Sequence, residues 1–164
     1  MSIDRLPPQS IEAEQSVLGA LLIDKDAVTE VAELLAPEDF YRQHHGMIYA
    51  AVLELFERRE PVDIVTVSEV LERQERLDEI GGSAYLTSLI NLTPTAVNVV
   101  HYARIVERKS VLRNLISAAG RIAGYGYEED GDVSEVIDKA ESELFAVSEK
   151  RLSSGFDSLK DLLH

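Results

Sequence analysis

The sequence predicts an all-α fold: a compact six-helix N-terminal globule, then an antiparallel helical hairpin and the start of a linker helix. Two observations carry this prediction. Apolar residues recur at steps of three and four up to Leu92, the spacing of one helix face. Residues 97–150 keep that spacing over a length that exceeds an ordinary globular helix. The expected boundaries are 1–94 for the globule, 95–150 for the hairpin and 151–164 for the linker and the beginning of its helix.

Six helical segments are expected in the globule. Leu6-Pro7-Pro8-Gln9 is an extended lead-in, because proline disfavours helix in the residue before it. Glu12 and Glu14 then lie in a first helical turn, where the helix dipole favours acids. The expected segments are 10–22, 28–35, a short helical turn at 37–41, 47–56, 66–71 and 84–92.

One short stretch also fits a strand. Val62-Asp63-Ile64-Val65 is rich in β-branched residues, which are common in strands. We expect an extended lead-in to a helix instead, because Thr66 and Glu69 have the spacing of a capping box.

The hairpin prediction depends on two apolar stripes separated by an acidic turn at 128–132. The stripes comprise Ile105, Leu112, Leu115, Ala119 and Ile122 on the first arm, and Val133, Ile137, Ala140, Leu144 and Val147 on the second. A hairpin alone cannot cover both its faces, so a partner is expected. Small residues on the first arm, Ser117, Ala118, Ala119, Gly120, Ala123 and Gly124, favour close approach of the second arm or of another subunit over a frayed or kinked helix.

Composition excludes several classes of protein. The absence of cysteine rules out disulfides and thiolate metal sites and suits a reducing cytoplasm. No apolar run approaches the roughly 20 residues of a membrane span, and the first residues do not resemble a signal peptide. The net charge of −14 argues against a phosphate-binding surface and suits solubility or a basic partner.

No catalytic, cofactor-binding or metal-binding constellation is recognisable. No glycine is followed by the Lys-Ser/Thr pair of a phosphate loop. The acidic turn lacks oxygen ligands at the first and last positions of a calcium loop. His44 and His45 would point about 100° apart on a helix, a poor geometry for chelation. We therefore expect a helix start there with both imidazoles at the surface.

Three stretches resemble one known family. They are Pro-Pro-Gln-Ser-Ile-Glu-Ala-Glu-Gln-Ser-Val-Leu-Gly at 7–19, Glu-Ile-Gly-Gly-Ser-Ala-Tyr-Leu at 79–86, and Tyr-Ala-Arg-Ile-Val-Glu at 102–107 with Leu112-Arg113. In this order and at these distances they resemble the N-terminal region of the bacterial replicative DNA helicase, the DnaB family.

The resemblance implies a role in assembly. In this family the hairpins of neighbouring subunits pair, and the N-terminal domains form a collar, a trimer of dimers, on a hexameric ring. DNA primase docks on the collar, and a helicase loader is a further partner. A separate RecA-like motor uses ATP and Mg to move 5′ to 3′ on single-stranded DNA. No residue here matches its nucleotide site, so this fragment is not expected to hydrolyse ATP. The helix that begins at Ser158 is similar to the family's linker helix.

Matching positions in the family imply five partner-binding residues: Glu12, Tyr85, Arg113, Ile116 and Ile122. They correspond to positions for primase docking and collar stabilisation. Contact with another chain is the favoured interpretation for Arg113. The two isoleucines and the tyrosine suit the core of one subunit equally well, because interface anchors and core residues share their chemistry.

Two other functions remain open at this point. One is the helicase-binding helical domain of a primase, which has a similar plan with a hairpin. The other is an unrelated helical protein-interaction module, enzyme or DNA-binding protein. The opening at Pro7-Pro8 argues against the first, and the acidic charge with no visible site argues against the second.

Overall fold

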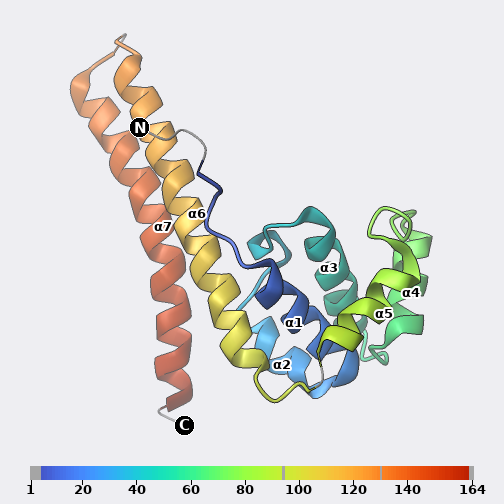
Figure 1. Ribbon diagram of the computed structural model, residues 1–164. Coiled ribbons are helices and arrows are strands. Elements are labelled where there is room, and N and C mark those ends of the chain that lie inside the picture. Colours follow the sequence, from blue (N-terminus) through green and yellow to red (C-terminus); the bar gives the residue numbers. More distant parts are fainter. Residues whose placement is uncertain (1–4, 94, 130, 163–164) are drawn as a thin grey trace. The chain divides into compact units, whose positions relative to one another are not determined.

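The computed structural model describes residues 5–93, 95–129 and 131–162, with side chains as far as Glu149. Every secondary-structure element among these residues is helical (Figure 1), so the all-α prediction is confirmed. The elements are α1 (Ile11–Ile23), α2 (Asp26–Ala32), the short 3₁₀ turn η1 (Pro37–Asp39), α3 (Gln43–Glu57), α4 (Ile64–Arg73), α5 (Gly82–Leu92), α6 (Val99–Tyr127) and α7 (Val133–Leu162).

The chain forms two compact units, one ending at Ser110 and the other beginning at Val111. The sequence placed this boundary at 94–95, but α6 contributes its first turns to the first unit. The reason is burial: Val99, Ala103 and Val106 recur at steps of four and three and belong to the same apolar core as α1 to α5.

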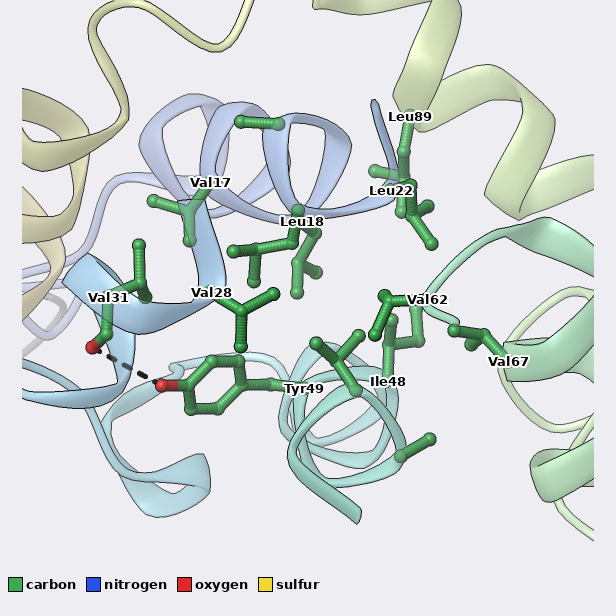
Figure 2. Packing of buried hydrophobic residues seen from close by; sticks show 14 of the residues in the cluster. Val17, Leu18, Leu22, Val28, Val31, Ile48, Tyr49, Val62, Val67 and Leu89 are labelled. Carbon is green, nitrogen blue, oxygen red and sulfur yellow. Dashed lines mark hydrogen bonds between the residues drawn. The ribbon is translucent and has the colours of Figure 1, made fainter. Parts of the chain in front are cut away.

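The core of the first unit is built mainly from aliphatic side chains. Figure 2 shows residues from five helices and the loop before α4 packed together, among them Val17, Leu18, Leu22, Val28, Val31, Ile48, Tyr49, Val62, Val67 and Leu89. Tyr49 is fully buried, and its hydroxyl donates to the carbonyl oxygens of Leu35 at 2.8 Å and Val31 at 3.3 Å. These two bonds join α3 to α2 and to the loop after it, and they satisfy the one polar atom of this side chain.

Side-chain caps explain where two helices begin. Ser10 Oγ accepts from the backbone N–H of Ala13 at 3.2 Å and caps α1. In α4, Asp63 Oδ1 accepts from the N–H of Thr66 at 2.9 Å, and Thr66 Oγ1 accepts from the N–H of Asp63 at 3.0 Å. The prediction that Thr66 itself begins the helix was therefore wrong. Because aspartate is a strong N-cap, Ile64 and the next residue join the helix.

In the second unit, α6 from Val111 onward and α7 lie side by side and are joined by the acidic turn (Figure 1), of which Asp130 lies outside the described residues. Glu143 on α7 connects them. One carboxylate oxygen is 2.8 Å from Nε of Arg121, and the other accepts from the Tyr125 hydroxyl at 2.8 Å. The partners are 22 and 18 residues apart and lie on opposite sides of the turn, as an antiparallel pair requires.

The expected linker at 151–157 lies within a helix, since α7 runs without interruption to Leu162. Its one glycine, Gly155, costs a helix only about 1 kcal/mol relative to alanine, which a long helix tolerates. The linker helix expected from Ser158 is likewise part of α7. Its side chains, and residues 163–164 as a whole, lie outside the described part of the chain.

Candidate partner-binding site

Glu14 lies on the buried face of α1, and its carboxylate reaches the N-terminus of α3. It accepts hydrogen bonds from the backbone N–H groups of Tyr41 at 2.7 Å and Arg42 at 3.4 Å. The first turn of α3 contains no acidic residue, and Arg42 at its N-cap makes no side-chain capping bond. Glu14 therefore supplies, from another helix, the acceptor and the negative charge that favour a helix start.

His45 connects this carboxylate to α5. Its Nδ1 lies 2.8 Å from Glu14 Oε1, and its Nε2 lies 2.6 Å from the hydroxyl of Tyr85. The side chain is fully buried, so the expectation of a surface imidazole was wrong for this residue. The reason is helical phase, because His45 precedes Ile48 and Tyr49 by three and four residues on the stripe of α3 that faces the core.

Tyr85 is the outer end of what we call the Glu14–His45–Tyr85 network. It is half-buried on α5, and its ring lies nearly parallel to that of His45, with the centroids 5.9 Å apart. The ring of His44 lies edge-on at 5.6 Å. Gln15 Nε2 lies 3.5 Å from the hydroxyl, at the limit of a hydrogen bond. The network thus runs from a buried carboxylate to the half-buried ring of Tyr85.

For a neutral His45, the hydrogen bonds of the network fit one tautomer. With His45 neutral, Nδ1–H donates to Glu14 and Nε2 accepts from the Tyr85 hydroxyl, so the tautomer follows from the partners. Burial, followed by the neighbouring His45 and Arg42, lowers the pKa of His44, while Glu14 opposes this shift. The arrangement orients an aromatic ring. In the described residues, no three His, Asp or Glu side chains are grouped in a way that could hold a metal ion.

The structure distributes the five predicted partner-binding residues over both units. Glu12 is exposed on α1 and Tyr85 is half-buried on α5, both in the first unit. In the second unit Arg113 and Ile122 are half-buried on α6, and Ile116 is 57% exposed. Ile116 therefore does not belong to the interior of the hairpin, which was one of its two interpretations.

The second unit leaves large apolar side chains exposed on both of its helices. Five large apolar side chains on α6 and α7 are 41% to 64% exposed: Leu115, Ile116, Ile137, Leu144 and Phe145. Of the predicted stripe on α7, only Ala140 and Val147 are half-buried. The apolar face of α7 is wider than a single neighbouring helix can cover.

Gly120 and Gly124 of α6 have free space beside them. A Cβ on Gly120 or Gly124 would meet no atom within 4 Å, and Ala118 is the small residue of this stretch that is buried. Of the two expected causes of close packing, approach of the second arm is therefore wrong at these glycines. Approach of another subunit stays a prediction.

Sequence reasoning missed Glu14 and His45, although a signal was present. Glu14 has the spacing of Val17, Leu18 and Leu21, all of them buried on α1. An ionisable residue within an apolar stripe predicts a buried polar contact, because an unpaired buried charge is costly. The same signal applies to His45 on α3. The sequence did not reveal that the two side chains meet, 31 residues apart.

None of the described helices combines the length and apolar character needed to cross a membrane.

Comparison with known proteins defines the class. The family model of the DnaB-like helicase N-terminal domain matches residues 6–108. The replicative DNA helicase DnaB of Geobacillus stearothermophilus is 49% identical over 160 residues, which cover 98% of this chain and 35% of that protein. The chain thus spans about a third of the length of this relative. It belongs to the DnaB-like helicase N-terminal domain family.

Solved structures share the fold. The N-terminal domain of DnaB helicase from Mycobacterium tuberculosis superposes with a TM-score of 0.83 at 48% identity, covering 87% of this chain and 99% of that one. A DnaB-like replicative helicase, described together with its interactions with primase, gives a TM-score of 0.72 at 26% identity, covering 86% of this chain and 31% of that one. The expected resemblance to this family is confirmed.

Proposed function

We propose that this chain is the non-catalytic N-terminal collar domain of a hexameric replicative DNA helicase in the cytoplasm. It would join subunits and recruit primase during DNA replication. The observation that carries the proposal is the 49% identity to a replicative helicase over nearly the whole chain. The ATP- and Mg-dependent motor, its single-stranded DNA and its 5′–3′ movement would belong to the other two thirds of such a protein.

Self-association is proposed to occur through the second unit, first as a dimer and then as three dimers in a hexamer. The exposed side chains of Ile137, Leu144 and Phe145 on α7 support this assignment. Apolar surface removed from water contributes about 25 cal/mol per Å², so a second copy covering these residues would stabilise the pair. Gly120 and Gly124 would let another helix approach closely.

Primase recruitment is proposed to involve the five residues inferred from the family. The solved relative described with its primase interactions supports the choice of partner. Tyr85 and Ile116 offer partly exposed apolar surface, which is common in interface anchors, and the net charge of −14 would favour a basic partner face. A helicase loader is a further proposed partner.

The mass of the 164-residue chain in solution tests assembly. We expect light scattering at high micromolar concentration to show a dimer or a larger species, and Leu144→Glu to shift the protein towards monomer. Val65→Glu is the matched control, because Val65 is also exposed but lies in the first unit. A monomer at every concentration would contradict the proposed assembly.

Binding to the helicase-binding domain of the primase from the same organism tests recruitment. We expect calorimetry to detect binding that Ile116→Ala weakens, since truncation of an interface anchor typically costs more than 1 kcal/mol. The control Ile23→Ala truncates an isoleucine of similar exposure on α1.

The chain should also show no ATP hydrolysis, and a measurable rate would contradict the non-catalytic role.

A further inference from the structure

We propose that Glu14 and His45 are positioning residues that hold the ring of Tyr85 in one orientation for a docking protein. This inference rests on the proposed function, because it assigns a purpose to the way Tyr85 is held within a partner-binding surface. It extends that surface inward to two buried residues that no partner can touch.

The hydroxyl of Tyr85 is directed at the interior of the domain. Its 2.6 Å bond to Nε2 of His45 is the shortest side-chain contact of the network, and the two rings lie nearly parallel at 15°. A docking protein therefore meets the aromatic ring rather than the hydroxyl group. The ring contributes apolar contact area with few rotatable bonds, which suits an interface anchor.

The ring is also restrained at its base and edge. Gly81, in the left-handed region at φ 105°, lies so close that a Cβ there would be 2.9 Å from Tyr85 Cβ. His44 contacts the ring edge-on, with the centroids 5.6 Å apart. The hydroxyl bond to His45 adds the contact at the far end of the side chain.

Glu14 fixes His45 in turn. The carboxylate is held by two backbone N–H groups at the start of α3, so it cannot rotate freely. For a neutral His45, its bond to Nδ1 selects the tautomer in which Nε2 accepts a hydrogen bond from the Tyr85 hydroxyl. The orientation of Tyr85 on α5 therefore depends on contacts that begin on α1 and pass through α3.

This arrangement lowers the cost of docking. A side chain that is mobile before binding loses conformational freedom when a partner orders it, whereas a ring already held in place does not. Removing the hydroxyl of Tyr85 or the imidazole of His45 should leave most of the Tyr85 ring surface intact. The ring would then be mobile before binding and would lose conformational freedom when the partner docks. Affinity should then fall about 3- to 10-fold.

The test is a double-mutant cycle on the complete chain, with the primase helicase-binding domain as the probe. We expect Tyr85→Phe and His45→Gln each to weaken binding about 3- to 10-fold. The double variant should bind about as tightly as whichever single variant has the lower affinity. Both changes break the same hydrogen bond between Tyr85 and His45. Tyr127→Phe removes the hydroxyl of a tyrosine that is 87% exposed, and should leave the affinity unchanged.

A spectroscopic readout accompanies the cycle. In ¹⁵N NMR spectra the Nε2 signal of His45 should have the position of a hydrogen-bond acceptor and should move in Tyr85→Phe. This measurement stays informative even where His45→Gln folds poorly. Cooperative thermal unfolding of each variant identifies losses that reflect misfolding alone.

The outcomes separate the two proposals. Unaltered affinity in folded Tyr85→Phe and His45→Gln, or effects that simply add in the double variant, would overturn the positioning role while leaving recruitment intact. Absence of binding by the unaltered chain would overturn recruitment and, with it, the positioning role. The NMR signal would then show only whether the hydrogen bond exists.

Discussion

The carboxylate of Glu14 lies 2.8 Å from Nδ1 of His45 across the contact between α1 and α3, and the two side chains are 2% and 0% exposed. Two buried polar groups of this kind are tolerated because each satisfies the other, and because backbone N–H groups take up the remaining acceptor capacity of the carboxylate. The two residues lie on the apolar stripes of α1 and α3, so their removal should lower the stability of the first unit.

Replacing Glu14 with alanine is expected to destabilise the protein by about 1–3 kcal/mol for each buried donor that is left without an acceptor. The substitution removes the acceptor of His45 and of the N–H groups at the start of α3. Urea-induced unfolding measures the change. Glu12→Ala is the matched control, since Glu12 is exposed two residues earlier on the same helix and should matter little. Equal effects of the two substitutions would contradict this account.

Tyr49 should make the first unit sensitive to high pH. Burial, and secondarily the nearby Asp39, raises the pKa of Tyr49 above its ordinary value of 10.0. The unfolded chain therefore loses this proton first. The contribution of Tyr49 is complete below about pH 10 and is lost as the pH rises from there towards the pKa of the folded state.

Tyr49→Phe tests this pH dependence. Near pH 8 the variant should be less stable by about 1–2 kcal/mol, because it lacks the bonds to two carbonyl oxygens. Near pH 11 that difference should shrink, because phenylalanine does not titrate. The measurement is the free energy of unfolding at both values, with Tyr127→Phe as the exposed control. A difference that is independent of pH would refute the prediction.

Gly19→Ala should destabilise the protein by at least about 1–3 kcal/mol, the typical cost of overpacking. A Cβ at this position of α1 would lie only 2.3 Å from Thr93 Oγ1 and 2.4 Å from the carbonyl oxygen of Leu89. The close approach of α1 and α5 depends on the missing side chain. Thermal unfolding checks the sign, and a variant as stable as the original chain would show that the two helices can separate at no cost.

Gly120→Ala should have the opposite effect on α6. Nothing lies within 4 Å of a Cβ placed there, so alanine should gain about 0.5–1 kcal/mol through its helix propensity. Thermal unfolding at low protein concentration measures this gain. The same variant examined by light scattering shows whether another subunit approaches this glycine, since close packing would then be lost and self-association would weaken.

The sequence predicted the helical segments well where apolar periodicity was long and regular. In α1 and α3 the spacing of the stripes located both the helices and most of the apolar residues that face the core. Boundaries were less predictable, because they depend on one or two local bonds. Asp63 rather than Thr66 is the N-cap of α4, and Gly155 does not interrupt α7.

The candidate site was only partly accessible to sequence reasoning. Tyr85 came from a resemblance between short segments, and its exposure was undetermined. That its hydroxyl meets His45, which in turn meets Glu14, depends on three helices that are distant in sequence. A pairing of this kind arises from the rotation and packing of whole helices, which local patterns do not encode.

The sequence alone determined the helical class, the acidic character and the family of this protein, because these follow from composition, periodicity and segment similarity. Tertiary structure alone decided which polar residues are buried together, and which apolar residues of α6 and α7 remain uncovered. The physical reason is the same in both cases. A helix face becomes core or surface only when a neighbouring element does or does not pack against it.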